Sequence, residues 1–338
     1  MNDFQRGFRP VIGVVCCGLL ALGCNSSNQP TPAKPPAAEP PFMSAVAGQA
    51  PVPPEDQAPA ADRTGGFDGK RAYDQVAKQV SFGPRPPGSS AIAKLQDYLI
   101  SELKSYGCAV DTDSFSADTP VGRVPMKNIL VKVPGQKPGI ILLGTHYDTK
   151  KMDNFVGADD GGSSTGVMLE LARQLCKQQP DKYAVWIAFF DAEEAFNPQW
   201  QDPDHTYGSR QMAAQFAASG DLPKIKAFIL ADLVGARTAR FQRDRESTPW
   251  VVELVWSVAA KLGYSGWFVN EVGGPGGDDH FSFTSRKVPS VDIITVIGDP
   301  KIAPYWHTPQ DTMANISPKV LAIVGHTILE SVKELQKK

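Results

Sequence analysis

Composition and charge place the chain among ordinary globular proteins. Of its 338 residues, 42% are hydrophobic and 21% are charged, which is enough for one large hydrophobic core or two small ones. The net charge of −2 gives no sign of a nucleic-acid-binding surface, and no apolar run after residue 24 approaches the roughly 20 residues that a membrane-spanning helix needs. We therefore expect no nucleic-acid partner and no membrane contact except through the N-terminus.

Residues 1–24 are predicted to be a targeting segment and not part of the fold. Arg6 and Arg9 precede the apolar stretch VIGVVCCGLLALG, which has the size of a signal-peptide core and is short for a membrane span. The stretch ends at Cys24 in LALGC, which resembles a bacterial lipobox. We expect export to the periplasm or cell envelope with a lipid anchor at Cys24. A plain secretory signal and an uncleaved anchor are the alternatives.

Residues 25–66 are predicted to be an extended linker. Ten prolines lie between Pro30 and Pro59, among many alanines, and such a stretch cannot bury a core. The linker would hold the folded body, residues 67–338, away from a membrane. Only Cys108 and Cys176 lie in that body. Export would permit a disulfide between them, but the sequence leaves their pairing open, and two cysteines are too few for a cysteine-rich zinc site.

The body is predicted to alternate helices and strands. A first helix is expected over 91–106, where apolar side chains recur at helical spacing and end at Gly107. Short apolar runs predict strands, and the last four of these are expected to be buried on both faces. The predicted strands are 128–133, 139–144, 184–190, 226–232 and 291–295, and the further helices are 163–175, 206–217, 249–262 and 317–335. The alternation predicts a single α/β domain with a largely parallel central sheet.

Histidine and acidic side chains follow every core strand from residue 139 onward. One such strand end would be ordinary, because strand ends meet solvent, but four of them favour a common site beyond the carboxyl ends of the strands. Mixed His, Asp and Glu ligands without cysteine suit a catalytic zinc, which keeps one position open. In chain order these residues are His146, Asp148, Asp159, Asp160, Asp191, Glu193, Glu194, Asp232 and His307, and Asp278, Asp279 and His280 precede the last strand.

The motifs HYDTK, GADD, EE and HTPQDT resemble those of the M28-type zinc aminopeptidases. Within that superfamily, FFDAEEAF…W…YGSR, DDHFSF and YWHT resemble the animal-type glutaminyl-peptide cyclotransferases, and the Trp-bearing insertion after the two glutamates is the most specific part. The resemblance covers about residues 70–335. It implies a three-layer fold with a mixed, mostly parallel sheet, one zinc ion per chain, a monomer, and conversion of N-terminal glutamine of peptides to pyroglutamate with release of ammonia. Thr145 and Thr165 stand where many animal enzymes have a bridging cysteine pair.

By this resemblance, Asp160, Glu194 and His307 hold the zinc ion and leave a fourth position for the substrate. Glu193, the neighbour of a ligand, is the general base and acid. Two adjacent residues at a strand end point in different directions, so one can bind metal while the other faces the substrate. The alternatives are that Asp160 caps a helix and that Glu193 is a solvated surface side chain.

The resemblance also assigns five residues around the reacting group. Asp232 and Asp278 would form a hydrogen-bonded acid network with Glu193, in which close carboxylates raise the pKa of one member. Trp200, Trp306 and Lys150 would line the substrate pocket. Asp232 as a plain loop residue, and the two tryptophans as core aromatics, are the alternatives.

Two other functions compete with the cyclotransferase. In a two-zinc aminopeptidase, His146, Asp160 and Asp232 would hold a second zinc ion, with Asp160 bridging and Glu193 activating water. A non-catalytic protein on the same fold, such as a lipid-anchored receptor for peptide N-termini, would be expected to lack Glu193 or a ligand, and this chain has all of them. The remaining histidines, His205, His280 and His326, are interpreted as structural.

Overall fold

The structure is a computed structural model that describes residues 52–178 and 182–338. The predicted signal, the expected anchor site at Cys24 and residues 25–51 of the predicted linker lie outside the described residues. Within the described ranges, no helix is long and apolar enough to cross a membrane.

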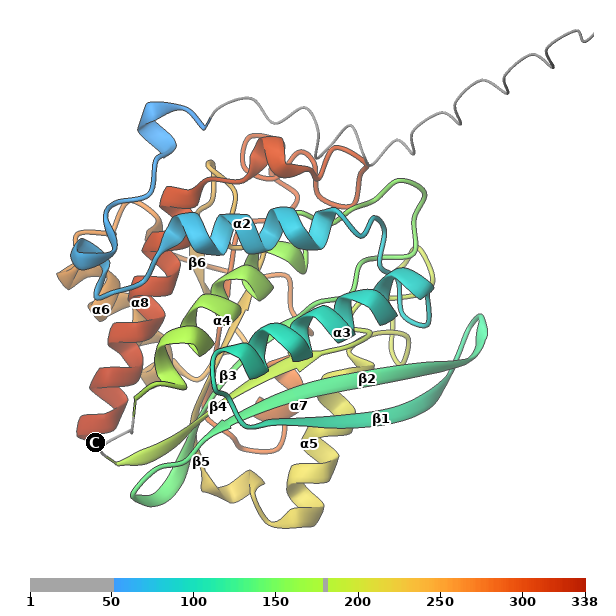
Figure 1. The fold of residues 1–338 in the computed structure, drawn as a ribbon, viewed down its shortest axis with the longest axis horizontal. Coiled ribbons are helices and arrows are strands. Elements are labelled where there is room, and N and C mark those ends of the chain that lie inside the picture. The colour runs from blue at the N-terminus through green and yellow to red at the C-terminus, as the bar shows by residue number, and fades with distance from the viewer. Residues whose placement is uncertain (1–51, 179–181) are drawn as a thin grey trace, which may run out of the picture. The chain divides into compact units, whose positions relative to one another are not determined.

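A mixed six-stranded sheet forms the centre of the described body (Figure 1). Its strands are β1 (Val110–Thr119), β2 (Gly122–Val133), β3 (Lys137–His146), β4 (Tyr183–Phe190), β5 (Ile225–Asp232) and β8 (Ser290–Ile294). Their order across the sheet is β1-β2-β4-β3-β5-β8. Strands β4, β3, β5 and β8 are parallel, whereas β2 pairs antiparallel with β1 and with β4. The predicted mixed, mostly parallel sheet is confirmed.

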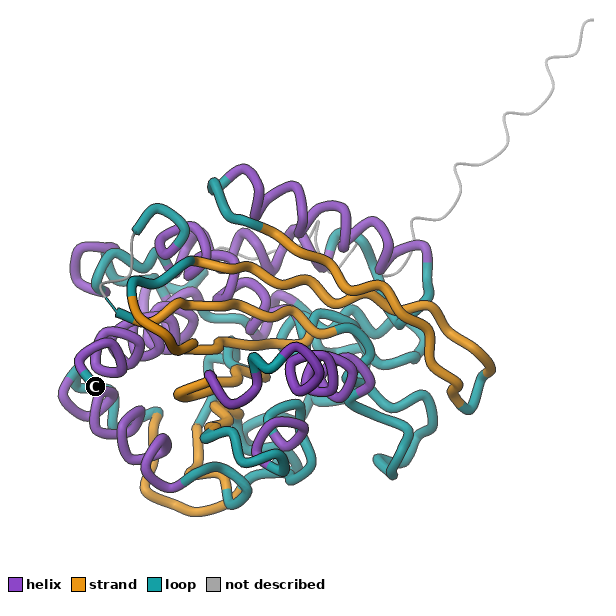
Figure 2. The backbone as a smooth tube through the Cα atoms, turned by 90° about the horizontal axis from the view of Figure 1, so that it is seen from below, coloured by secondary structure: helices purple, strands orange, loops and turns teal. Residues whose placement is uncertain are grey.

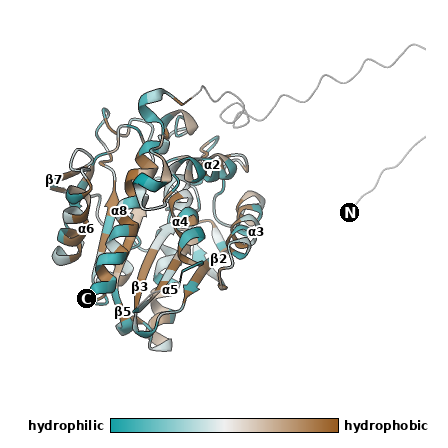
Figure 3. Ribbon diagram, turned by 60° about the vertical axis from the view of Figure 1, so that its left-hand side comes forward, coloured by the Kyte–Doolittle hydropathy of each residue, from teal (hydrophilic) through white to brown (hydrophobic). Residues whose placement is uncertain are grey.

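Helices cover both faces of the sheet, and for this reason its parallel strands are apolar on both sides (Figure 2). Alternate side chains of β3 divide between two cores: Ile141 and Leu143 belong to the larger one, Ile140 and Leu142 to the smaller. The larger core is closed by α2 (Gly69–Val80), α3 (Ser90–Ser105), α4 (Gly162–Leu175), α6 (Pro249–Lys261) and α8 (Pro318–Lys337), the smaller by α5 (Tyr207–Ser219) and α7 (Phe281–Thr284). The hydropathy colouring in Figure 3 shows apolar strands beneath helices with hydrophilic outer sides. The three-layer prediction is confirmed.

Polar side chains at the helix starts fix where the helices begin. The Asp68 carboxylate accepts the backbone N–H groups of Lys70 and Arg71 at the start of α2. Ser89 and Ser317 do the same for the first turns of α3 and α8. Each cap satisfies donors that a helix start leaves without a partner.

A smaller parallel sheet, which the sequence does not predict, lies beside the main one. It consists of β6 (Phe241–Asp244) and β7 (Phe268–Gly273). An isolated bridge joins Phe241 to Thr295, directly after β8. The small sheet therefore reaches the carboxyl edge of the parallel strands.

The folded body begins before residue 67, so the prediction of an extended linker was wrong for residues 52–66. Short 3-10 helices occupy Pro54–Asp56 and Ala61–Thr64. The Asp56 carboxylate accepts a hydrogen bond from the Ser317 hydroxyl (3.0 Å) and pairs with Arg237 (2.8 Å). A proline in the first turn, as at Pro54, has the backbone angle that a helical turn needs, so proline content alone does not make this segment extended.

The pairing that the sequence left open is settled in the structure. Cys108 and Cys176 form a disulfide across a sequence separation of 68 residues. It joins the turn before β1 to the residue that caps the end of α4. The bond therefore links the edge of the sheet to the helix layer that covers it.

Candidate active site

The carboxyl ends of the parallel strands surround a cleft of about 310 Å³. Strands β3 and β5 end at His146 and Asp232, and the loops after β4 and β8 bring Glu193 and His307 to the same edge. The nine residues to which the resemblance assigned a catalytic, substrate-binding or metal-binding role all line this cleft: Lys150, Asp160, Glu193, Glu194, Trp200, Asp232, Asp278, Trp306 and His307. The topology thus brings together side chains that are up to 157 residues apart, Lys150 and His307.

Asp160, Glu194 and His307 form a group that can hold a metal ion. Their ligand atoms lie within 4.8 Å of one another, with His307 Nε2 3.2 Å from Glu194 Oε1 and 3.4 Å from Asp160 Oδ2. Asp160 Oδ2 and Glu194 Oε2 are buried without a hydrogen-bond partner, as expected of oxygens that serve a cation. One imidazole and two carboxylates suit zinc and leave a position open. Burial lowers the pKa of His307, but the two carboxylates outweigh it and raise this pKa to about 10 in the metal-free protein.

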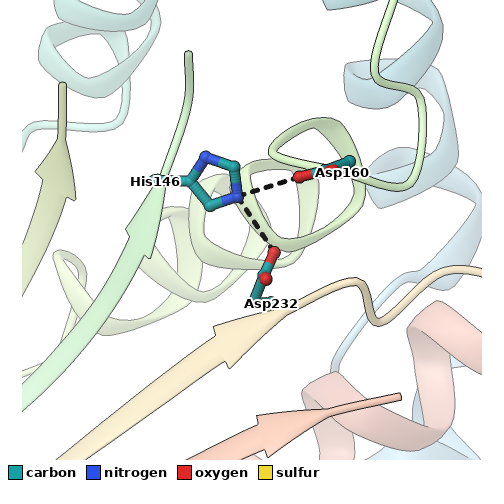
Figure 4. Close-up of side chains that lie close together, drawn as sticks. All are labelled: His146, Asp160 and Asp232. Atoms are coloured by element: carbon teal, nitrogen blue, oxygen red, sulfur yellow. Dashed lines mark hydrogen bonds and ion pairs between the residues drawn. The ribbon is translucent and has the colours of Figure 1, made fainter. Parts of the chain in front are cut away.

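A second metal-capable group, His146, Asp160 and Asp232, shares Asp160 with the first (Figure 4). His146 Nε2 lies 3.0 Å from Asp232 Oδ1 and 3.3 Å from Asp160 Oδ1, so one ring nitrogen faces both carboxylates. Burial raises the pKa of Asp232 to about 7, although the nearby His146 opposes the shift. The two oxygens of Asp160 therefore face two different histidines.

The adjacent glutamates are held by the carboxylate of Asp148, which is fully buried. Asp148 accepts the backbone N–H of Glu193 at 3.0 Å and that of Glu194 at 3.3 Å. Lys150 Nζ lies 3.5 Å from Glu194 Oε2 and donates to the carbonyl of Ala195 at 3.1 Å. With its backbone fixed in this way, Glu194 turns its carboxylate to the first metal-capable group, while Glu193 reaches the cleft on the side of His146.

Glu193 has the properties of a group that moves a proton. Burial raises its pKa well above the ordinary range, and the neighbouring carboxylates of Asp278 and Glu194 add to the shift against the opposing effect of His146. Glu193 Oε2 lies 4.0 Å from His146 Nδ1. A carboxyl group whose pKa is raised in this way can act as an acid and as a base near neutral pH.

The loop that carries Asp160 is fixed by residues to which the sequence assigned no role. Asp311, in the quoted motif HTPQD, accepts the backbone N–H groups of Asp159 (2.9 Å) and Asp160 (3.1 Å). The Tyr305 hydroxyl donates to Asp159 at 2.7 Å. The guanidinium of Arg85, fully buried, donates to the carbonyls of Val156 and Gly157 in the same loop. Only the motif around Asp311 offers a sequence signal for this support; Arg85 offers none.

Two tryptophans form the outer walls of the cleft. Trp200 is 41% exposed and stacks on His205, with ring centroids 4.3 Å apart. Trp306 stacks on His307 at 4.1 Å. Neither is a buried core aromatic, and both face the cleft. The structural interpretation of His205 omitted its contact with Trp200, for which the polar loop sequence gives no signal.

The lower wall of the cleft is apolar and was not predicted. Leu233, Ile294 and Ile297 line it together with Pro275. Leu233 follows an apolar strand and Ile294 ends one, so the sequence alone would place both in the core. In contrast, His280 is buried, with Nε2 3.1 Å from Asp244 Oδ2, and does not line the cleft.

Several residues at the rim of the cleft have a left-handed backbone. Ala192 (φ 56°) precedes Glu193, Leu233 (φ 49°) follows Asp232, and His307 (φ 51°) is itself a candidate metal ligand. Thr206 (φ 49°) directly precedes α5. The left-handed region is unfavourable for residues other than glycine. Such strained residues cluster at functional sites, where they aim neighbouring side chains.

Residues 128–332 match the model of peptidase family M28. This chain belongs to peptidase family M28. Among curated proteins it is similar to the mouse glutaminyl-peptide cyclotransferase-like protein, with 34% identity over 265 residues, 69% of this chain and 67% of that protein. The similarity agrees with the sequence resemblance to M28-type glutaminyl-peptide cyclotransferases.

Two solved structures extend this similarity to the fold. A glutaminyl cyclase from an Acidobacteriales bacterium is 34% identical, with a TM-score of 0.74 over 86% of this chain and 99% of that one. A Zn-dependent exopeptidase from Parabacteroides distasonis is also 34% identical, with a TM-score of 0.71 over 78% of this chain and 97% of that one. The chain is therefore an M28-family homologue of glutaminyl cyclases with the fold of zinc exopeptidases.

Proposed function

We propose that the protein is a zinc-dependent glutaminyl-peptide cyclotransferase, which converts the N-terminal glutamine of peptides and proteins to pyroglutamate and releases ammonia. The observation that carries the proposal is the cleft, in which the buried acid Glu193 shares one cavity with a metal-capable group and two tryptophan walls. The similar glutaminyl cyclases support it.

One zinc ion per chain, held by Asp160, Glu194 and His307, would supply polarisation of the glutamine γ-carboxamide carbonyl. The two buried carboxylate oxygens that lack a hydrogen bond, and the mixed ligand set, fit such an ion. Lys150, beside Glu194, holds that carboxylate in place and lines the cleft next to the substrate.

Glu193 performs the proton transfer in this proposal. The substrate α-amine attacks the γ-carbonyl carbon, the new C–N bond closes a five-membered ring, and the bond to the amide nitrogen breaks. Glu193 accepts a proton from the attacking amine and returns it to the departing nitrogen, which leaves as ammonia. Asp232 and Asp278 orient the amine toward the carbonyl. No water takes part as nucleophile.

Trp200 and Trp306 bind the glutamine side chain between apolar surfaces. A flat apolar wall suits a neutral amide, and the cleft volume of about 310 Å³ lies at the lower end of the usual range for small-ligand pockets. A curled glutamine that fills such a cleft has its amine near its own carboxamide, which lowers the entropic cost of ring closure.

A two-zinc aminopeptidase is the second candidate, because His146, Asp160 and Asp232 form a second metal-capable group. The similar exopeptidase from Parabacteroides distasonis favours the same reading. If this chain is a two-zinc aminopeptidase, its Glu193 would activate water, and the peptide bond after the first residue of the substrate would be cleaved.

The product distinguishes the two candidates. Residues 52–338, incubated with zinc and a Gln-Ala peptide, should yield ammonia and a peptide lighter by one ammonia, and Glu193→Gln should abolish this reaction. Glu253→Gln, a change at an exposed glutamate on α6 that pairs only with Arg243 and Ser257 among the described residues, is the matched control and should leave it unchanged. Free glutamine as the product, with two zinc ions per chain, would establish the aminopeptidase instead.

We further propose that the protein is exported to the periplasm or cell envelope as a monomer anchored by a lipid at Cys24. The Cys108–Cys176 disulfide supports export, because disulfides persist in oxidising compartments. In a bacterial host the full chain should partition with membranes, and Cys24→Ala should release it; a wild-type protein in the cytosolic fraction would contradict the proposal.

A further inference from the structure

A second cavity, of about 170 Å³, adjoins the active-site cleft. Pro275, Ile294 and Ile297 line both cavities, so these three residues form the border between them. On the far side the second cavity is lined by Gln242 of β6, by Gly273 at the end of β7 and by Gly274, which follows it. The small β6–β7 sheet therefore supplies a wall that the main sheet does not.

The side chains that line the second cavity are uncharged, and the only carboxylate bonded to one of them among the described residues is Glu271, which accepts a hydrogen bond from Gln242 Nε2 at 3.0 Å. Besides the three border residues, its described lining consists of one glutamine, one threonine, one valine and two glycines. The buried hydroxyl of Thr295 is already engaged, since it accepts the backbone N–H of Arg240 at 3.1 Å. An unpaired charge would be costly in such surroundings, whereas an aliphatic or amide side chain would be accepted.

The shape of the cavity is set by the glycine-rich segment 273–277. Gly274, Gly276 and Gly277 have positive φ angles of 97°, 78° and 79°, which only glycine adopts without strain. A side chain at Gly273 would collide with the amide of Gln242. The N–H of Gly277 donates to Glu246 at 2.7 Å and anchors the segment. The glycines thus fix the path of the backbone that borders the second cavity.

We propose that the second cavity binds the side chain of the residue that follows the N-terminal glutamine. The inference rests on the proposed cyclotransferase function. If glutamine fills the cleft, the peptide leaves it across the border of Pro275 and Ile297, and the second residue is the first to reach the adjoining space. A water molecule occupies about 30 Å³ of liquid, so 170 Å³ holds roughly five non-hydrogen atoms. The cavity selects uncharged side chains up to about the size of leucine or glutamine.

The test compares second residues in the protein of residues 52–338 with zinc. The substrates are glutamine amide, which has no second side chain, and the dipeptide amides Gln-Leu, Gln-Gln, Gln-Asp and Gln-Lys. We expect kcat/KM for Gln-Leu and Gln-Gln to exceed that for Gln-Asp and Gln-Lys by about tenfold, the size of one good pocket contact, mainly through KM.

Gln242→Glu then places a carboxylate in the second cavity and not in the cleft. The ratio of kcat/KM for Gln-Lys over Gln-Leu should rise about fivefold, as for a partly exposed ion pair. Gln215→Glu, which adds the same charge on an exposed position of α5, is the matched control and should leave the ratio unchanged.

Each outcome bears on the proposal. Equal kcat/KM for all second residues, or an unchanged ratio in Gln242→Glu, overturns the inference while cyclisation of glutamine amide still supports the enzyme function. A wild-type protein that releases ammonia from none of these substrates overturns the proposed function, and the inference with it.

Discussion

Removal of the Asp148 carboxylate should weaken both the fold and metal binding, because this one group holds the backbone of Glu193 and Glu194. Asp148→Asn preserves the size of the side chain but leaves one accepting oxygen for two N–H groups, and its NH₂ group faces the second. A hydrogen bond to a charged acceptor contributes about 1.5–3 kcal/mol, so we expect the free energy of unfolding to fall by about 2 kcal/mol. Asp148→Ala leaves both N–H groups without this acceptor and should lose about twice as much.

Two assays separate these effects. Urea denaturation of the metal-free protein gives the change in unfolding free energy, and zinc titration against a competing chelator gives the affinity. Loss of a group that orients a metal ligand typically lowers affinity by about 10–100-fold, and we expect the lower end for Asp148→Asn. Asp153→Asn, at an exposed aspartate in the same loop, is the control and should stay within about 0.5 kcal/mol of wild type. Unchanged stability and zinc affinity in Asp148→Asn would refute the reasoning.

Three further predictions concern stability. Deleting residues 52–66 should lower the free energy of unfolding by about 2 kcal/mol, because the contacts of Asp56 with Ser317 and Arg237 are lost. Urea denaturation of residues 52–338 and of residues 67–338 measures the difference. Reducing the Cys108–Cys176 disulfide, which closes a separation of 68 residues, should lower it by up to about 4 kcal/mol, and an unchanged urea midpoint in dithiothreitol would contradict this. Burial raises the pKa of Asp191 from 3.8 to about 8, so the folded wild type loses stability from this group as pH rises through that interval. Asp191→Asn does not titrate, and its stability relative to wild type should therefore improve by about 4 kcal/mol between about pH 5 and pH 8; equal values at both would count against the shift.

The central strands could be predicted because burial on both faces requires an uninterrupted apolar run. Among the parallel strands, β3 differs most from its prediction, at 137–146 in place of 139–144, and the others differ by at most a single residue at either end; the antiparallel strand β2 begins six residues before its predicted start at residue 128. Strand β1 could not be predicted, since it pairs only with β2 at the sheet edge and carries aspartate, serine and threonine along its length. Helix α2 was omitted from the prediction although Ala72, Tyr73, Val76 and Val80 recur along it at helical spacing.

The site residues could be predicted where a polar residue type coincides with a position at the end of a buried strand. Polar residues at the end of a buried strand or a few residues after it, such as Asp232 and Glu194, stand out from the apolar sequence before them. Apolar residues that line the cleft, such as Ile294, could not be predicted, because they are chemically the same as residues of the core. The role of Arg85 depends on carbonyl groups that are about 70 residues away, and composition cannot indicate it.

The left-handed backbone at Ala192 lowers the stability of the fold but fixes the directions of the two glutamates that follow. A residue with a β-carbon in this conformation costs about 1–2 kcal/mol, and glycine would remove the cost. Ala192→Gly would also let the two glutamates that follow sample directions that the present backbone forbids. Laboratory evolution that screens for heat resistance alone would accept this change early and lose turnover with it, whereas a screen for both properties would retain alanine.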